Sequence, residues 1–203
     1  MSHCTTFKFQ YTNRKLVAGA FEKLGLECKD GVVCSYASEY DKRMGVVKSK
    51  KSAMIASRDG FNYFMEDYGN HYELSIEKPD MTLDEERRAS RLGDEFRKSY
   101  IEEAALDFIN QMNQKGNMCV LDKTDNSYVI KFGSMYEKNI MIKFENGRVV
   151  EEVQGVKGKE CASITEALEK MLSSENADLN KEWTSEYYED SGDGLLIYSL
   201  NQF

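Results

Sequence analysis

Apolar residues recur along the chain with two different spacings, and these spacings predict where strands and helices lie. Alternating apolar residues predict a strand over residues 5–11. Stripes with the three-to-four-residue spacing of an amphipathic helix follow Asn13, cover residues 82–115 and run over residues 163–172. The middle stripe fits one long helix, or two helices joined near Gly93.

Residues that favour helix ends bracket these three stripes. Thr12 or Asn13 can cap the start of the first helix, and Gly25 can take the left-handed conformation that ends it. The pairs Thr82–Glu85 and Ser163–Glu166 have the spacing of a capping box, in which each residue bonds the backbone of the other. The second and third helices are therefore predicted to begin at these pairs.

Turn residues divide the remaining apolar segments into hairpins. Asp30–Gly31 predicts a turn between two extended pieces, and residues 44–77 are typical of a meander of short strands. Asp125–Asn126 and Asn146–Gly147 predict two further hairpins. The expected fold class is α+β, with antiparallel sheets of hairpins and three amphipathic helices packed on one face. The order of elements suggests a ferredoxin-like arrangement.

Composition and charge narrow the classes of function. The chain has 203 residues, of which 41% are hydrophobic, and it lacks an apolar run long enough to span a membrane. The N-terminus lacks the basic-then-apolar order of a secretion signal, so a cytoplasmic location is expected and no membrane partner. A formal net charge of −8 argues against a general binder of polyanions, so nucleic acid is a disfavoured partner.

One basic run keeps a nucleic-acid alternative open. It lies over residues 42–51, and its candidate binding residues are Lys48, Lys50 and Lys51. Aromatic residues of the neighbouring meander could stack on the bases of a single strand if they were exposed. The other interpretation is a solvated loop or a strand edge protected by lysines, beside aromatic residues that a helix covers.

Histidine and cysteine offer few candidates for chemistry. His3 and Cys4 are adjacent, but neighbouring residues of a strand point to opposite faces and cannot easily hold one metal ion. Cys161 lies near a helix start, where a thiolate is favoured, yet nucleophilic catalysis also needs a histidine base. A thiol or metal enzyme built on these three residues remains the third alternative. We expect no catalytic residues, no metal and no cofactor.

A short glycine-containing segment joins the last predicted hairpin to the helix after it. Gly155 and Gly158 lie where the chain must turn, and glycine permits the positive φ that such corners need. The spacing does not match a phosphate-binding loop. Lys157 and Lys159 could still attract an anion at the helix start.

The first residues of the chain resemble a known family. The chain opens with Met1, Ser2, His3 and Thr5 and continues into a predicted helix that ends at Leu24 and Gly25. This opening resembles the conserved chloroplast open reading frame thirty-five family, also called domain of unknown function twelve fifty-seven. The similarity in layout extends over residues 1–133.

A longer motif occupies the last hairpin and the helix that follows. Its residues are Gly147, Arg148, Val149, Glu151, Val153, Gly155, Lys157, Gly158, Cys161, Thr165 and Glu169. Residues 138–190 therefore resemble a second family, domain of unknown function twenty-nine ninety-seven. Asn146 stands where that family usually has Asp, and Ser185 stands where we would expect Pro.

The two resemblances imply a protein partner and carry over no catalytic residue. They imply two domains, over residues 1–135 and 136–203, of types that are often encoded side by side near an AAA-type ATPase. The second domain is expected to be a small ββα unit with an acidic, aromatic tail. Fusion in one chain implies that the two domains act together in one complex.

The expected function is a non-enzymatic interaction or accessory module. It could be an adaptor of an AAA-type ATPase or a phage factor that binds a host protein. Aromatic residues within an acidic tail are typical of a segment that docks on a protein. The candidate partner-binding residues are Trp183, Tyr187, Tyr188, Lys157 and Lys159.

Overall fold

The fold is α+β, as predicted, and contains two larger antiparallel sheets of six and four strands. The chain forms two compact units: one is Tyr11–Glu103, and the other combines Met1–Gln10 with Ala104–Phe203. Over the ranges given next, no helix is long and apolar enough to cross a membrane. The computed structural model describes residues 3–31, 33–36, 38–46, 48–124, 127–133, 135–145, 148–157, 160–174 and 180–183.

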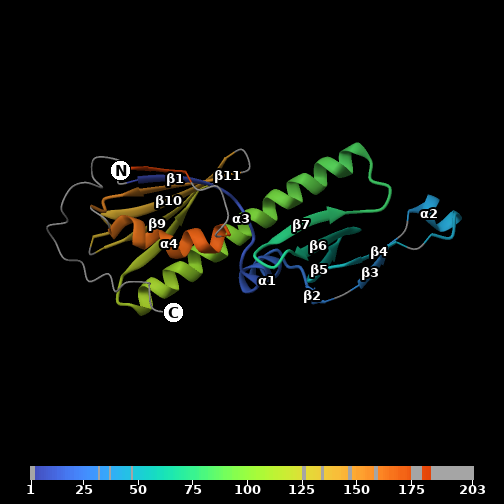
Figure 1. Cartoon of the computed structure of the whole chain (residues 1–203), viewed down its shortest axis with the longest axis horizontal. Helices are drawn as coiled ribbons and strands as arrows, with labels where there is room; N and C mark the ends of the chain where they lie inside the picture. The colour runs from blue at the N-terminus through green and yellow to red at the C-terminus, as the bar shows by residue number, and fades with distance from the viewer. Residues whose placement is uncertain are drawn as a thin grey trace. The chain divides into compact units, whose positions relative to one another are not determined.

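Helices and strands alternate along the chain in an order that Figure 1 shows from blue to red. The described elements are β1 (His3–Lys8), α1 (Arg14–Lys23), β2 (Lys29–Asp30), β3 (Val33–Tyr36), α2 (Glu39–Arg43), β4 (Lys48–Lys51), β5 (Met54–Arg58), β6 (Phe61–Asp67), β7 (Tyr72–Glu77), α3 (Leu83–Gln114), β8 (Cys119–Lys123), β9 (Ser127–Phe132), β10 (Lys138–Glu145), β11 (Arg148–Gln154), α4 (Glu160–Leu172) and β12 (Asn180–Trp183).

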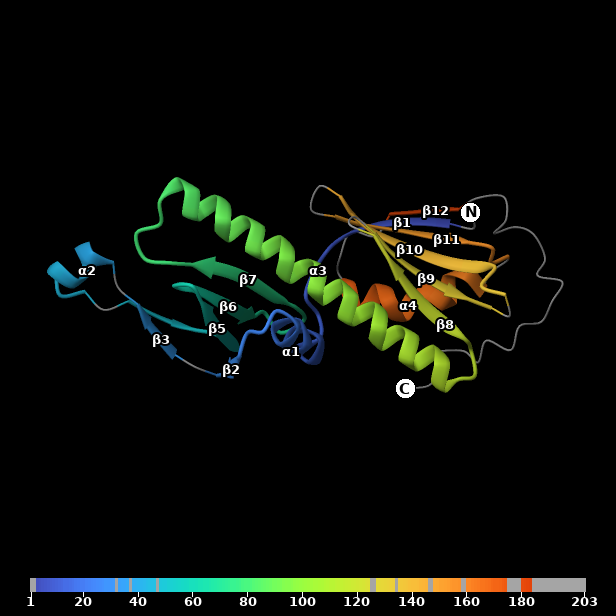
Figure 2. The same ribbon diagram turned by 180° about the vertical axis from the view of Figure 1, so that it is seen from behind.

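The six-stranded sheet belongs to the unit that contains both ends of the chain. Its strand order is β12-β1-β11-β10-β9-β8, and every neighbouring pair is antiparallel. Strands β8 to β11 form a meander, and the N-terminal strand β1 lies between β11 and β12 (Figure 2). This order is a meander with an added strand, and it differs from a ferredoxin-like sheet, which needs crossover connections.

One face of this sheet is buried and the other is half-exposed. On β11 the buried residues alternate, at Val149, Glu151 and Val153. Their buried cross-strand neighbours are Ile140 and Ile142 on β10 and Thr5 and Phe7 on β1. Helix α4 and the last third of α3 supply buried side chains to the same unit. Because only one face of the sheet is closed, both helices cover that face.

The second unit packs aromatic rings between its four-stranded sheet and two helices. Its sheet has the order β2-β5-β6-β7, which confirms the predicted meander. The ring of Phe21 on α1 lies 4.6 Å from that of Phe96 on α3 and 6.2 Å from that of Tyr63 on β6. These rings are buried, so they form the core of this unit.

The local signals for helix ends are largely confirmed. The side chain of Asn13 accepts hydrogen bonds from the backbone N–H groups of Lys15 and Leu16, and Gly25 has φ +68°. The backbone N–H of Thr82 donates to Glu85 Oε2 at 2.9 Å, as in a capping box. Helix α3 is continuous from Leu83 to Gln114, so the long-helix alternative is the correct one.

Two local predictions are wrong. The pieces on either side of Asp30–Gly31 do not form a hairpin, because β2 pairs with β5 whereas β3 pairs with β4. Gly31 has φ +60° and its N–H donates to Ala53, so the chain leaves one sheet there and enters another. Ser163 does not cap α4, because the helix already begins at Glu160.

The compact units are divided differently from the predicted domains. The predicted boundary after residue 135 lies between β9 and β10, which pair from Ser127–Lys143 to Phe132–Lys138. The first strand, β1, pairs with β11 along its whole length. Strand pairing over more than a hundred residues of sequence therefore places the N-terminal strand and the family-like C-terminal segment in one sheet.

Candidate functional site

A two-stranded arm leaves the four-stranded sheet of the second unit. Strands β3 and β4 pair from Val33–Lys51 to Tyr36–Lys48, and the short helix α2 lies at their outer end (Figures 1 and 2). The tip is a built turn: the Ser38 hydroxyl accepts from Asp41 N–H at 2.9 Å and donates to Asp41 Oδ2 at 2.8 Å. The arm therefore presents a defined helical turn rather than a loose loop.

Large apolar side chains are exposed at this tip. Tyr40 is 70% exposed, Met44 62% and Val46 45%. They follow one another within seven residues, and Gly45, with φ +67°, turns the chain between the last two. Scattered exposed apolar residues are ordinary, but a group of three on a projecting turn is typical of a contact surface. We call Tyr40, Met44 and Val46 the tip cluster.

The arm is basic in an acidic chain. Residues 33–51 carry five Lys or Arg residues and two acidic ones, whereas the whole chain has a net charge of −8. Lys42 and Arg43 are exposed and lie beside the tip cluster on α2. The arm therefore differs from the rest of the chain in the sign of its charge.

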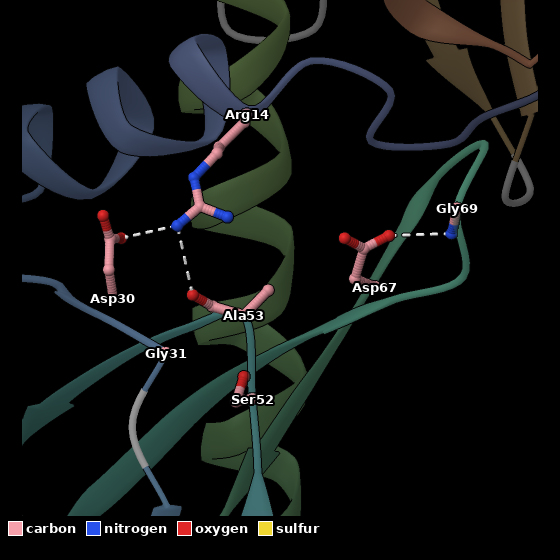
Figure 3. A pocket seen from close by; sticks show the side chains of 7 residues that line it. All are labelled: Arg14, Asp30, Gly31, Ser52, Ala53, Asp67 and Gly69. Atoms are coloured by element: carbon pink, nitrogen blue, oxygen red, sulfur yellow. Dashed lines mark hydrogen bonds and ion pairs between the residues drawn. The ribbon is translucent and has the colours of Figure 1, made fainter.

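The base of the arm is fastened by a network around Arg14, at a surface hollow of about 760 Å³. In Figure 3 the Arg14 guanidinium reaches down from α1 between Asp30 and Ala53. Its Nη2 lies 3.0 Å from Asp30 Oδ1 and donates to the Ala53 carbonyl oxygen at 3.4 Å. The Ser52 hydroxyl donates to the carbonyl oxygens of Met54 and Met65, at 2.6 and 2.7 Å.

The charged groups of this hollow already have partners within the unit. Asp67 accepts from the N–H of Gly69 at 2.7 Å and so closes its own turn (Figure 3). Asp30 is paired with Arg14, which also holds the segment where β4 passes into β5. The residues that line the hollow therefore hold the base of the arm in place, and we assign the hollow no ligand.

A second polar site lies in the interior of the other unit, on the buried face of the six-stranded sheet. Lys181 on β12 is paired with Thr5 on β1, and Thr5 is paired with Glu151 on β11. Thr5 and Glu151 are both fully buried. Cross-strand partners lie side by side on one face, so these three side chains form a polar row.

Helix α4 adds two polar residues above this row. The Thr165 hydroxyl donates to Glu169 Oε1 at 3.1 Å. The Lys181 ammonium lies 2.8 Å from each carboxylate oxygen of Glu169, in a largely buried ion pair. Among the described residues, the Thr5 hydroxyl and the two carboxylate oxygens of Glu151 have no partner with the full geometry of a hydrogen bond. The Thr165 hydroxyl is nevertheless near enough to Glu151 to influence its pKa. We call Thr5, Glu151, Thr165 and Glu169 the buried acidic cluster.

Burial controls the protonation of this cluster. It raises the pKa of Glu151 well above the usual value, and the charge of Glu169 raises it further. Lys181 and the Thr165 hydroxyl lower the same pKa to a smaller extent. An isolated buried carboxylate is costly, so a neutral, protonated Glu151 beside the Glu169–Lys181 pair gives a cluster without net charge.

The structure describes two of the five predicted partner-binding residues, Trp183 and Lys157, and does not test the prediction. Trp183 is half-buried on β12, opposite His3 of β1. Lys157 is exposed and follows β11. Lys159, Tyr187 and Tyr188 lie outside the described residues. Gly155 has the predicted role at the corner, with φ +75°; a Cβ there would lie 2.4 Å from the Glu137 carbonyl oxygen.

The predicted nucleic-acid surface combined the lysines of residues 42–51 with the aromatic residues of the meander, and the structure tests only the aromatic part. Lys48, Lys50 and Lys51 lie on β4 of the arm, and their side chains lie outside the description. Phe61, Tyr63 and Phe64 of the meander are buried. The covered-face interpretation of the meander is therefore correct for these three rings, which cannot stack on bases.

The described thiols are not activated. Burial raises the pKa of Cys4, and the charges of Glu152 and Glu182 raise it further. Burial also raises the pKa of Cys119 to about 11. A protonated thiol is a weak nucleophile, so these sites have no thiolate at neutral pH. The side chain of Cys161 lies outside the description, and in the described part no group of three His, Cys, Asp or Glu could hold a metal ion.

The sequence contains a signal for the buried acidic cluster besides the family motif. In the segment Arg148–Gln154 a glutamate occupies the middle of three alternating positions whose other members are valines. A charged residue in the buried phase of a strand indicates a special environment. The signal at the arm tip is weaker, because Tyr40, Met44 and Val46 show no periodicity.

Comparison with known families supports one of the two resemblances. Residues 141–188 match the family described as "Protein of unknown function (DUF2997)", which confirms the second resemblance over those residues. Nothing supports the resemblance of residues 1–133 to the chloroplast reading-frame family, which stays a prediction. No curated protein matches the chain, and no solved structure matches it. The family-like segment contains Glu151, Thr165, Glu169 and Lys181, so the buried acidic cluster belongs largely to it.

Proposed function

We propose that this chain is a non-enzymatic, cytoplasmic accessory module that binds another protein through the tip of its β3–β4 arm. The observation that carries this proposal is the exposed tip cluster of Tyr40, Met44 and Val46, on a capped turn at the end of a paired ribbon. Large apolar side chains on a projecting element lose water contact when they enter a partner's groove.

The charge of the arm selects the kind of partner. Lys42 and Arg43 flank the apolar residues, so a complementary groove carries carboxylates at its rim. The partner is therefore a protein with an apolar groove and an acidic border. An AAA-type ATPase, which the family resemblance implied, is the first candidate to test.

The anchored base supports the same role. The Arg14 contacts with Asp30 and Ala53 hold the arm to the body of its unit. A fixed base reduces the entropy that the arm loses when it binds, and so favours affinity. The arm thus behaves as a preformed contact element.

The test compares two methionines that differ in place but not in type. Three full-length proteins are used as bait in the native cell. They are the wild type, the tip variant with both Tyr40→Ala and Met44→Ala, and the control variant Met135→Ala. Met135 is 84% exposed and lies in the other compact unit, so it controls for a general loss of apolar surface. A protein recovered with the wild type and with Met135→Ala, but lost with the tip variant, is then purified.

Binding to the purified partner decides the proposal. Each tip substitution is expected to weaken binding about tenfold or more, as for a residue at the centre of an interface. Charge reversal at Lys42 is expected to slow association and to reduce its dependence on salt. Equal affinity of the tip variant and the wild type would refute the arm as the contact surface. Binding of a nucleic acid in place of a protein would favour the alternative built on the lysines of β4.

A further inference from the structure

We infer that the buried acidic cluster is a binding site for the ammonium group of a lysine on an extended strand, and that Lys181 fills this site from within the chain. This inference is independent of the proposed function, because the cluster and the arm tip lie in different compact units. It assigns to the family-like segment a ligand class: a β strand that carries a lysine.

The contacts of Lys181 define the recognition. Its ammonium contacts both oxygens of Glu169, at 2.8 Å each, and Glu169 is only 6% exposed. The Thr165 hydroxyl bonds the same carboxylate from the next turn of α4 and fixes its orientation. Charge-assisted hydrogen bonds in a dry site are strong, and removal of the cation leaves a buried carboxylate unpaired.

Unused hydrogen-bonding capacity shows that this site is more than a closed ion pair. Glu151 is fully buried, and among the described residues neither of its oxygens has a partner with full hydrogen-bond geometry, the nearby Thr165 hydroxyl included. The Thr5 hydroxyl, between Lys181 and Glu151 in the row, has none either. Buried polar groups are nearly always paired in folded proteins, and groups that are not often belong to a functional site.

The element that brings Lys181 to the site is a short edge strand. In the described residues β12 pairs with His3–Thr6 of β1, whereas β11 pairs with all of His3–Lys8. An edge strand can be replaced by a strand from another chain, which gains backbone hydrogen bonds along β1 and places its side chains at alternate positions. On such a strand, a lysine at the position opposite Thr5 would reach Glu169, as Lys181 does.

Other charged groups near the strand lie on the opposite face of the sheet. Cys4, Glu152 and Glu182 belong to the half-exposed face, where Lys143 pairs with Glu152 at 2.9 Å. On the buried face the charged residues named by contact and register are Glu151, Glu169 and Lys181. The preference for a cation therefore comes from the carboxylate of Glu169, beside a neutral Glu151.

A chemical-rescue experiment tests the ammonium site. Lys181→Ala in the full chain removes the side chain beyond Cβ, and n-propylammonium replaces the missing atoms. We expect n-propylammonium chloride to raise the thermal midpoint of this variant saturably, by about 2–4 °C or more. Tetramethylammonium chloride at the same concentration is expected to have no such effect, since it has no N–H donor. The double variant Lys181→Ala with Glu169→Gln is expected to lose the rescue.

A peptide experiment tests recognition of a strand. The full chain carries two substitutions. Lys181→Glu places a negative charge against Glu169 and so frees the edge of β1. Trp183→Phe removes the chain's single tryptophan. A peptide with the sequence of Asn180–Trp183 and a few flanking residues then supplies the only tryptophan signal. We expect binding at least about tenfold tighter than for the same peptide with Met in place of Lys, one interaction of about 1.4 kcal/mol.

The results of these two experiments distinguish a lysine-binding site from a Lys181–Glu169 ion pair that only stabilises the fold. Rescue by n-propylammonium together with a lysine preference of the peptide supports the site. No rescue, or equal binding of the Lys and Met peptides, overturns it. If Lys181→Glu fails to fold by circular dichroism, Lys181→Ala with Trp183→Phe takes its place with the same two peptides. Loss of partner binding by the arm variants bears on the proposed function alone.

Discussion

The two compact units bury polar groups in opposite ways. In the unit of Tyr11–Glu103, the Tyr100 hydroxyl is buried and accepts from the backbone N–H groups of Thr12 and Asn13, at 3.0 and 3.1 Å. In the other unit Glu151 is equally buried, and its oxygens have no partner in the described part of the chain. Both residues lie within a well-packed apolar core.

This difference separates a structural polar group from a candidate site. The Tyr100 hydroxyl ties the start of α1 to α3, and it does so because the capped end of α1 offers free N–H groups. Glu151 makes no comparable pair of hydrogen bonds in the described residues, although burial of a polar group without well-formed hydrogen bonds is unfavourable. Glu151 is expected to weaken the fold and belongs to the family motif, whereas Tyr100 stabilises the fold. Glu151 is therefore the stronger candidate for a functional residue.

The largest effect is expected in the aromatic core. Phe96→Ala leaves a cavity beside Tyr11 and Phe21, whose rings lie 5.5 and 4.6 Å from that of Phe96. We expect a loss of about 3–5 kcal/mol in the free energy of unfolding, measured in urea. Glu95→Ala, at the exposed neighbouring position, is the control and should change stability by less than about 0.5 kcal/mol. A small effect at Phe96 would contradict the packing described.

The next largest effects are expected from removing one buried polar group in each unit, the Tyr100 hydroxyl and the Glu151 carboxyl. Tyr100→Phe leaves two backbone N–H groups without their acceptor and should destabilise the chain by about 1–3 kcal/mol. Glu151→Gln removes an unpaired carboxyl and should stabilise it at pH 8, by an amount of the same order. Opposite signs in urea unfolding would support the distinction between the units. Equal signs would show that Glu151 has a stabilising partner.

The pH dependence of the second variant sharpens this test. The pKa of Glu151 is raised in the folded protein, so folding favours its protonated form. The stability contribution of this residue is greatest below the unfolded pKa of about 4.3 and falls as the pH rises toward the folded pKa. The advantage of Glu151→Gln over the wild type should therefore be close to zero at pH 4 and should grow with pH. An advantage that is constant with pH would refute the raised pKa.

The smallest effect is expected on the helix surface. Asp84 and Arg87 form an exposed pair at 3.2 Å on the first turns of α3. Because both side chains are largely in water, Arg87→Ala should change the free energy of unfolding by less than about 1 kcal/mol, and added salt should remove the difference. Arg14→Ala is the contrasting variant, since Arg14 also holds the Ala53 carbonyl at the base of the arm. It should reduce stability more and in a way that salt does not abolish.

Much of the local structure was predictable because its causes lie within a few residues. The long helix needed only the apolar stripe and the Thr82–Glu85 pair, and both signals were present in one segment. The corner at Gly155 needed only glycine's freedom at positive φ. The failure at Asp30–Gly31 arose because the chain there pairs with β5 and β4, which lie later in the sequence.

The candidate sites were less predictable. Glu151 was visible as a motif residue and as a charged member of an alternating strand, but its lack of partners depends on β1 and α4. The tip cluster depends on which apolar residues the two units leave uncovered. The aromatic meander illustrates the reverse case, because burial by α1 and α3 removed a surface that composition alone had suggested.

The sequence by itself determined the α+β class, the caps at the starts of α1 and α3, the hairpins after α3 and the family-like segment. These depend on spacings and backbone preferences that act over short distances along the chain. Only the tertiary structure decided that the first strand lies between β11 and β12, and that Lys181, Thr5 and Glu151 share a row. Residues so distant in sequence meet only when strand pairing and burial of the whole sheet bring them together, and no local pattern encodes that contact.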